Sequence, residues 1–169
     1  MNKLKKTFLY YDGIAQGYKD LYHEEQIKKI ILVEKYFLNN GLMLDLGSGD
    51  GVLNQFISEN VDLISFDLSF NLLNLNNNKY KIQGIIEKLP FKDNVFDCVC
   101  AFTSIQDIEN PCIAIINVQR ILKKRGIFIL SFLKISSSYL DVLREINKYF
   151  DILIKLEEEK DYIFVLKRK

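Results

Sequence analysis

The chain has 169 residues, of which 49% are apolar and 27% are charged, a balance typical of one globular domain with its own hydrophobic core. The formal net charge of +1 excludes a global electrostatic attraction to nucleic acid or to an anionic membrane. The apolar run 127–133 is too short to cross a bilayer, and residues 8–11 are too few for a signal-peptide core. We therefore expect a cytoplasmic protein without a membrane span or a nucleic-acid signal, and the oligomeric state stays open.

The first part of the chain alternates between helical and extended patterns of apolar residues. Gly13 and Gly17 predict turns in the N-terminal segment. Asn39-Asn40-Gly41 is typical of the end of a helix. In chain order we predict a turn-rich segment (1–20), a helix (24–38), a strand that leads from 41 into a glycine turn (47–51), and a helix that continues to about Glu59.

The same alternation continues to the C-terminus. In chain order we predict a strand (61–67), a short helix capped by Ser69, a strand (80–86), a loop (89–94), a strand (95–102), a helix begun by Asn110-Pro111, a strand (127–133), a helix (138–150) begun by a capping box of Ser138 and Asp141, and two strands (152–156 and 162–167). Such alternation predicts a parallel sheet covered on both faces, while the last two strands, joined by a tight turn, must be antiparallel to each other.

Three cysteines are too few for a disulfide framework. Cys98 and Cys100 alternate onto one face of a predicted strand, and Cys112 lies just inside a helix. The single histidine, His23, is distant from all three along the chain, so we expect core thiols and no metal site.

Charged clusters are expected at both edges of the sheet. The acidic turn 157–159 follows a strand that runs with the parallel ones, which places it at their carboxyl ends, where ligands bind in open α/β sheets. The basic residues 123–125 precede a parallel strand and 167–169 end an antiparallel one, so both belong at the opposite edge, near each other. An acidic turn beside the ligand edge disfavours a polyanionic substrate.

The glycine turn indicates a ligand that the backbone approaches closely, because glycine has no Cβ to block the approach. It also aims the first free N–H groups of the following helix at that ligand. The sequence lacks the Gly-Lys-Ser/Thr ending of a phosphate-binding P-loop, and its third glycine, Gly51, comes one residue early for a dinucleotide fingerprint. Asp50 would also repel a pyrophosphate. A nucleoside with a charged amino-acid end and no phosphate, such as S-adenosylmethionine, fits better.

The segment 45–51, Asp-Leu-Gly-Ser-Gly-Asp-Gly, resembles motif I of the class I S-adenosylmethionine-dependent methyltransferases. Asp67, 22 residues after Asp45, matches the family's ribose-binding acid. Family spacings are also met by Leu89-Pro90-Phe91, Phe96-Asp97, Pro111, Arg120-Ile121-Leu122 and Gly126, and Tyr11-Asp12 with Ala15 and Tyr18 is similar to the N-terminus of the ubiquinone/menaquinone biosynthesis branch.

The resemblance implies a Rossmann-like, doubly wound α/β fold with a seven-stranded sheet, mostly parallel, with one antiparallel strand near the C-terminal edge. Residues 41–169 would form the methyltransferase core as a single domain, and residues 1–40 a helical lid segment of the same domain. The implied methyl donor is S-adenosylmethionine, with S-adenosylhomocysteine as the product.

The resemblance assigns cofactor-binding roles to residues after the first two strands. Asp67 would accept hydrogen bonds from both ribose hydroxyls, although an acid here can also cap the next helix. Asp45 would face the ammonium of the ligand, although it can also accept N–H groups of the turn. Gly47 and Gly49 would let the backbone approach the methionine end, and Ser48 between them belongs to the same predicted set.

Adenine recognition is where the sequence departs from the family. The position of the acid that reads the adenine amine is Ile85, which cannot accept a hydrogen bond. Ile86 retains a backbone N–H, Glu87 is a substitute acid, and Leu68 is expected on the adenine face. Phe102, at the end of the fourth strand, completes the predicted cofactor-binding residues of the core.

No residue is an obvious catalytic base. Gln106 and Asp107 occupy the positions of a histidine pair in the relatives, and Asp107 can equally be a loop acid. His23 is a further candidate base, against the alternative of a surface or packing residue. Tyr11 and Tyr18 are predicted to close over the cofactor as part of the lid, or else to pack on the sheet.

The implied reaction is in-line displacement at the methyl carbon, which depends mainly on positioning. The methyl acceptor is unidentified, with a small molecule favoured slightly over RNA or protein. The alternative is an inactive subunit that binds S-adenosylmethionine or a partner within a methylating complex.

Overall fold

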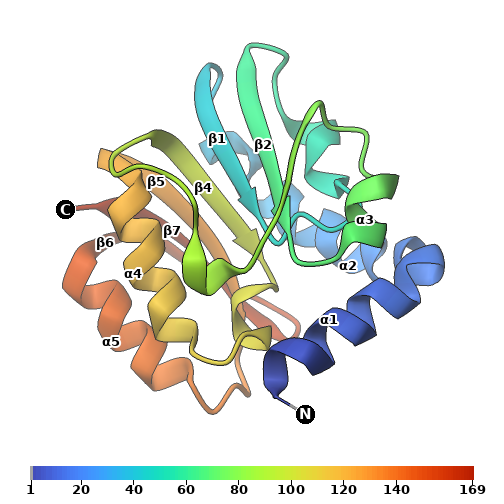
Figure 1. Ribbon diagram of the computed structural model, residues 1–169. Coiled ribbons are helices and arrows are strands. Elements are labelled where there is room, and N and C mark those ends of the chain that lie inside the picture. The colour runs from blue at the N-terminus through green and yellow to red at the C-terminus, as the bar shows by residue number, and fades with distance from the viewer. Residues whose placement is uncertain (1) are drawn as a thin grey trace.

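The apolar runs of the sequence form one seven-stranded sheet in the computed structural model, which describes residues 2–169 (Figure 1). The strands are β1 (Gly41–Leu46), β2 (Val61–Asp67), β3 (Tyr80–Gln83), β4 (Phe96–Phe102), β5 (Leu122–Leu133), β6 (Phe150–Glu158) and β7 (Asp161–Arg168). The α-helices are α1 (Lys3–Ile14), α2 (Tyr18–Val33), α3 (Phe70–Leu75), α4 (Pro111–Ile121) and α5 (Tyr139–Tyr149). Short 3-10 helices are η1 (Ala15–Gly17), η2 (Glu34–Tyr36), η3 (Val52–Phe56), η4 (Ile86–Lys88) and η5 (Ile105–Asp107).

The strand order is β3-β2-β1-β4-β5-β7-β6, so the chain winds outward from β1 in two directions. Strands β1 to β5 pair in parallel, whereas β7 is antiparallel to both of its neighbours, β5 and β6. This is the predicted Rossmann-like sheet with one antiparallel strand near its C-terminal edge. The strand order reverses between β1 and β4, where open α/β sheets bind their ligands.

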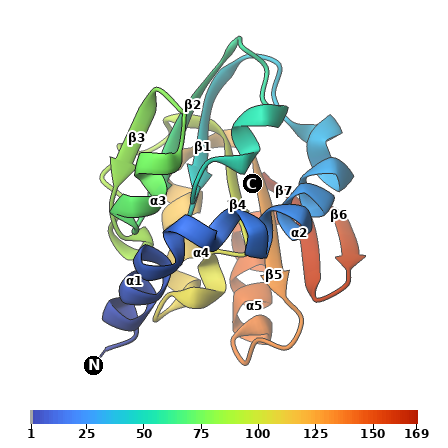
Figure 2. The same cartoon turned by 90° about the vertical axis from the view of Figure 1, so that its right-hand side faces the viewer.

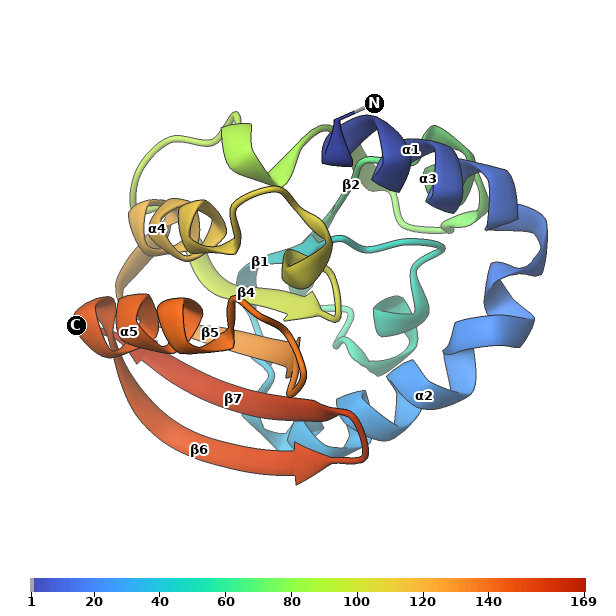
Figure 3. The same cartoon turned by 90° about the horizontal axis from the view of Figure 1, so that it is seen from below.

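Two hydrophobic cores sandwich the sheet, one on each face. Helices α4 and α5 cover one face through residues such as Ile115 and Ile146, and α2 covers the other through Ile30 and Val33 (Figure 3). Because both faces are covered, the central strands read as nearly continuous apolar runs. Cys98 and Cys100 are buried among the residues of the α2 face, and Cys112 is half-buried in α4, as predicted.

The N-terminal segment differs from the prediction, because residues 1–20 were expected to be turn-rich and are largely helical from Lys3 onward. Gly13 lies inside α1 and costs only about 1 kcal/mol of helix propensity. Helix α2 also begins earlier than predicted and ends at Val33, before the single turn η2. Helix α1 lies beside α3, where the carboxyl ends of the parallel strands meet (Figure 2).

The predicted helix after the glycine turn is also wrong, since only the 3-10 helix η3 forms and it ends at Phe56. The Asn54 N–H donates to the Gly51 carbonyl three residues back rather than four. Strand β3 stops at Gln83, so Ile85 and Ile86 lie outside the sheet, and Ile86 begins η4 instead of extending the strand.

The C-terminal third shows smaller corrections. Strand β5 already begins at Leu122 through an irregular pairing with β4, and Arg125 adopts a left-handed φ of 65° there. The capping box of Ser138 does not form, because the Ser138 side chain makes no cap hydrogen bond and Asp141 pairs with Arg144 at 2.9 Å. Strands β6 and β7 are longer than predicted. The caps by Ser69 and Asn110 are confirmed.

The charged clusters lie where the sequence places them. Lys167 pairs with Ile127 across β5 and β7, and the Arg168 guanidinium donates to the Leu122 carbonyl, so the two basic clusters are neighbours. The acidic turn lies at the carboxyl ends of the parallel strands, where the Lys134 ammonium contacts a Glu157 carboxylate oxygen at 3.2 Å.

Candidate functional site

A cavity opens at the carboxyl ends of β1, β2 and β4, and its space including the mouth is about 660 Å³. Helix α1 and the start of α2 cover it. The predicted residues that line it are Gly47, Gly49, Asp67, Leu68, Ile86, Glu87, Phe102, Asp107, Tyr11 and Tyr18.

The glycine turn is held by the next strand. The N–H groups of Gly47 and Ser48 donate to the Phe66 carbonyl at 2.7 and 3.1 Å. Gly47 adopts a φ of 81°, and a Cβ at this position would lie 2.3 Å from the Ser104 Cβ, so only glycine fits between β1 and the loop after β4. The Gly51 N–H donates within the turn. These N–H groups of the turn are thus used within the protein, and the expectation that the first N–H groups of the following helix point at the ligand stays a prediction.

Asp67 joins the glycine turn to the end of β2. One carboxylate oxygen accepts from the Gly49 N–H at 2.8 Å and the other from the Ser69 N–H at 2.7 Å. Each carboxylate oxygen can accept two hydrogen bonds, so acceptor capacity remains toward the cavity that Asp67 lines. Burial raises the pKa of Asp67 above its ordinary value, and the hydrogen bonds from Ser69 and Gly49 oppose this rise.

Asp45 lies in a smaller recess beside the cavity, together with Tyr18, Gln26 and Ser48. Its side chain is buried, and burial together with the nearby Asp67 carboxylate raises the pKa of Asp45 to about 8. The N–H groups of the turn at Gly47, Ser48 and Gly49 donate to other acceptors, so this carboxylate is not satisfied by them.

Further acceptor atoms in this recess have no hydrogen-bond partner within residues 2–169. They are the Gln26 Oε1, the Ser48 Oγ and the Asp50 Oδ1 atoms, all of them buried. A recess of this kind favours a ligand group with several donors, because buried acceptors without partners cost free energy.

The opposite end of the cavity contains Ile85, Ile86, Glu87 and Leu68. The Asn117 amide donates to the carbonyls of Ile86 and Glu87, both at 3.1 Å, and so holds η4 against α4. One Glu87 oxygen accepts from a backbone N–H at 3.2 Å, while its Oε2 is buried and has no partner in the described chain. Glu87 therefore offers an acceptor beside the apolar surface of Leu68.

The three candidate catalytic residues lie in different surroundings. Asp107 lines the cavity and accepts from the Tyr11 hydroxyl at 2.6 Å; burial raises its pKa, which the hydrogen bond opposes. Gln106 is buried and does not line the cavity. His23 pairs with Asp50 at 2.7 Å and lines a separate polar hollow, so the structure does not bring it to Asp67 and Asp107.

The lid helices contact both sides of the cavity. Asp12 accepts from the Ser69 hydroxyl at 2.9 Å and from the Asn71 N–H at 3.0 Å, which joins α1 to α3. Lys3 and Thr7 donate to backbone carbonyls of residues 106–108 on the other side. Tyr18 lies over the turn, with its ring 3.4 Å from the place of a Cβ on Gly49. Both predicted tyrosines therefore line the cavity rather than packing only on the sheet.

Sequence reasoning missed several lining residues, namely Leu4, Thr7, Leu72, Thr103, Ser104 and Ile108. Thr103 and Ser104 follow β4 directly, so the rule that ligands bind at the carboxyl ends of strands was a usable signal. Leu4 and Thr7 gave none, because their segment was expected to be turn-rich.

Within residues 2–169, no group of three or more histidine, cysteine or acidic side chains is placed to hold a metal ion. Over the same residues, none of the helices combines the length and the apolar character needed to cross a membrane.

A family model described as "Methyltransferase domain" matches residues 44–130, just over half of the chain. The chain belongs to this methyltransferase family. The matched segment begins before the glycine turn and ends in β5, so it contains Asp45, Asp67 and the loop after β4.

Two curated relatives are similar to this chain at the sequence level. Uncharacterized protein MJ1252 of Methanocaldococcus jannaschii is 30% identical over 125 residues, which cover 71% of this chain and 49% of that protein. The ubiquinone/menaquinone biosynthesis C-methyltransferase UbiE of Vibrio cholerae is 27% identical over 124 residues, covering 64% of this chain and 45% of that one. The chain thus spans about half the length of the curated relatives it matches.

The fold is shared with solved methyltransferases. The SAM dependent methyltransferase from Aquifex aeolicus has a TM-score of 0.70 and 13% identity, and the match covers 83% of this chain and 89% of that one. At this identity the likeness shows the fold alone.

Proposed function

We propose that this methyltransferase-family chain binds S-adenosylmethionine in the cavity and transfers its methyl group to a small-molecule acceptor. The observation that carries the proposal is the position of Asp67, a buried carboxylate at the end of β2 that contacts the glycine turn and lines the cavity. Residues 41–169 form the catalytic core in this proposal, and residues 1–40 act as its lid.

The side chains present match the parts of the cofactor. Asp67 is proposed to accept from the ribose hydroxyls. Asp45, with the unpartnered acceptors of its recess, is suited to an ammonium group. The unpartnered Glu87 Oε2 supplies the acceptor that Ile85 lacks for an adenine amine, and Leu68 supplies an apolar face.

The protein's own part in the reaction is positioning. When bound, S-adenosylmethionine supplies a methyl group already activated by its sulfonium, and well-oriented reactants can gain about 7–11 kcal/mol. Helix α1 covers the cavity and excludes water. Asp107 is the candidate proton acceptor for an acceptor hydroxyl or amine, because it lines the cavity and burial raises its pKa above the ordinary value of a carboxyl group.

The lining near Asp107 supports a small acceptor. Leu4 and Ile108 make this end largely apolar, with the Thr7 side chain beside them. Helix α1 is joined to the core on both sides of the cavity, which narrows the access that a nucleic acid or a folded protein would need.

Ligand binding is the first test. S-adenosylmethionine and S-adenosylhomocysteine should each raise the thermal unfolding temperature, because a ligand at 100 times its Kd adds about 2.7 kcal/mol of stability. No shift with either ligand at millimolar concentration would contradict the proposal.

A methyl-transfer screen tests whether the methyl group is transferred to a small molecule. Labelled cofactor would be offered with fractionated small molecules, RNA and protein, and label is expected in a small-molecule fraction. Label in RNA or protein would contradict the small-acceptor proposal. Binding without transfer to any fraction would favour the alternative of an inactive binding subunit.

A further inference from the structure

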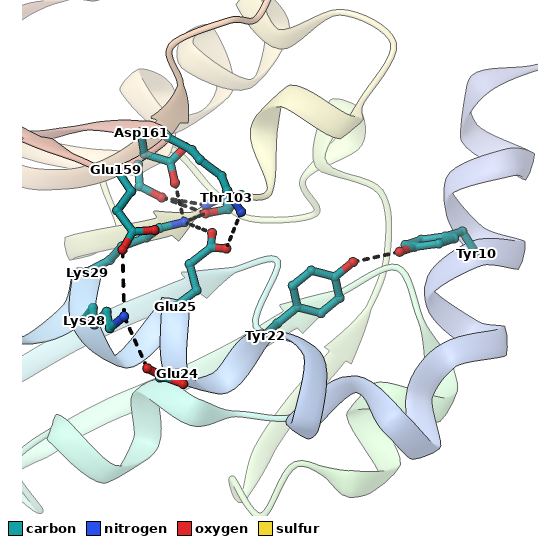
Figure 4. Close-up of polar contacts among 11 residues, drawn as sticks. Tyr10, Tyr22, Glu24, Glu25, Lys28, Lys29, Thr103, Glu159 and Asp161 are labelled. Atoms are coloured by element: carbon teal, nitrogen blue, oxygen red, sulfur yellow. Dashed lines mark hydrogen bonds and ion pairs between the residues drawn. The ribbon is translucent and has the colours of Figure 1, made fainter.

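Lys29 is a lysine without any exposed surface, which is rare for this residue type. It lies on α2 and reaches the carboxyl end of β4 and the first residue of the antiparallel strand β7 (Figure 4). Its ammonium donates to a Glu25 oxygen at 2.6 Å and to the Thr103 hydroxyl at 2.7 Å, and it forms an ion pair with Asp161, which is also fully buried. Two of the three donors of the ammonium group therefore make hydrogen bonds, and the buried Asp161 carboxylate balances its charge.

Thr103 is the partner of Lys29 that lines the cofactor cavity. Its φ is 53°, a left-handed value that a β-branched residue rarely adopts and that costs of the order of 1–3 kcal/mol. Such a conformation persists only where the surroundings impose it. Here the Thr103 N–H donates to the Ser131 hydroxyl at 2.8 Å, and the Thr103 hydroxyl contacts both Ser131 and Lys29.

The left-handed turn at Thr103 sets the course of the loop that follows. The next residue, Ser104, donates its hydroxyl to the Leu46 carbonyl at 2.7 Å and packs against Gly47. Three residues later Asp107 reaches Tyr11 of α1. The loop after β4 is thus held at its start by α2 and at its end by α1, and both ends line the cavity.

We propose that Lys29 is a positioning residue, which acts through Thr103 to hold the loop after β4 against the glycine turn. The inference rests on the proposed function in taking the cavity as the cofactor site. A purely stabilising ion pair would not need the Thr103 hydroxyl, and buried ion pairs often contribute little net stability. The hydrogen bond from Lys29 to Thr103, a strained residue of the cavity, distinguishes a positioning role from a purely stabilising one.

Hydrogen exchange by mass spectrometry on the full chain without ligand tests the inference. In Lys29→Met, the amides of residues 103–108 should be accelerated about tenfold more than those of β2 and α4, which report any general loss of stability from the buried Asp161 left without its partner. The matched control is Lys28→Met, since Lys28 is the adjacent lysine on α2, half-exposed and paired with Glu24 at 3.2 Å. It should leave the loop unchanged.

A second pair of variants decides the matter if Lys29→Met does not fold. Thr103→Val keeps the shape and the Lys29 ion pairs but removes the hydroxyl, and should loosen residues 103–108 to a similar extent. Thr103→Ser retains the hydroxyl and should keep the protection. The inference would be overturned if residues 103–108 of Thr103→Val exchanged at the rate of the unsubstituted protein. It would also be overturned if exchange were accelerated equally throughout the domain.

Binding of S-adenosylhomocysteine by calorimetry separates this inference from the proposed function. If the unsubstituted protein does not bind, the proposed function fails, and the exchange measurement still decides the role of Lys29. If it binds, Thr103→Val should weaken the affinity about tenfold, whereas Lys28→Met should not. Unchanged affinity in Thr103→Val would contradict the inference.

Discussion

Asp67 connects two segments that are distant in sequence but adjacent at the edge of the sheet. Its carboxylate accepts from the N–H groups of Gly49 and Ser69, which orients both oxygens before any ligand arrives. Such pre-orientation lowers the entropy cost of binding. The carboxylate thus has a structural and a proposed ligand-binding role at once.

Replacement of Asp67 by alanine should weaken S-adenosylmethionine binding at least about tenfold, or about 1.4 kcal/mol, because the hydrogen bonds to the ribose are lost. Calorimetry measures the affinity. Asp62→Ala is the matched control, since Asp62 lies on the same strand and is exposed. Equal affinities in the two variants would show that the ribose binds elsewhere.

Asp45 makes the proposed binding reaction dependent on pH. Its pKa of about 8 in the ligand-free protein means that the carboxyl group is protonated at neutral pH. A ligand ammonium favours the ionised carboxylate and so lowers this pKa. Binding at about pH 7 should therefore release a proton, and affinity should rise as the pH approaches about 8 from below.

Calorimetry in buffers of different ionisation enthalpy measures this proton release. Close to one proton is expected at about pH 7 for the unsubstituted protein. Asp45→Asn should bind more weakly and release none, because asparagine does not titrate. Identical proton release in both proteins would assign the titration to a different group.

Helix α1 illustrates how an element without a buried residue is held in place. Its contacts are polar and reach both sides of the cavity, through Asp12 to α3 and through Lys3, Thr7 and Tyr11 to the loop after β4. Because few apolar contacts oppose its separation, α1 is suited to opening for ligand exchange.

Asp12→Ala should accelerate the dissociation of S-adenosylhomocysteine about tenfold, because it removes the hydrogen bonds to Ser69 and Asn71. Stopped-flow measurement with displaced ligand gives the rate constant. Asp20→Ala, at an exposed aspartate in the first turn of α2, is the control. A rate equal to that of the control would show that α1 does not gate the cavity.

The whole sheet depends on the two cores that cover its faces. Strand β5 lies between β4 and β7, and its residues contribute to both cores. The site is built where the strands end, so the cores carry stability and the loops carry the proposed chemistry.

Truncation of the core should therefore lower stability strongly. Leu130→Ala, at a fully buried position of β5, should cost about 2–5 kcal/mol in the free energy of unfolding. Leu140→Ala, at a position that is 70% exposed, should stay within about 0.5 kcal/mol. Urea unfolding measures both, and similar losses would contradict the assigned burial.

Most of the sheet could be read from local patterns. Several features depend only on nearby residues: the apolar runs of β1, β2 and β4, and the helix caps at Ser69 and Asn110. The spacing of Asp67 from the glycine turn is also a local feature of the sequence. The alternation of strands and helices then favours one parallel topology, since crossovers are restricted. The family resemblance rested on these same features.

The structure was needed where distant residues decide the outcome. Helix α1 is joined to the loop after β4, and the contacting residues are separated by 96 to 105 positions along the chain. No local sequence pattern contains such a relation. The same holds for His23, which pairs with Asp50 instead of reaching the cavity, and for Lys29, whose periodicity on α2 gives no sign of its contact with Thr103. Backbone preferences act over a few residues, whereas the positions of these side chains depend on contacts that exist only once the sheet has assembled.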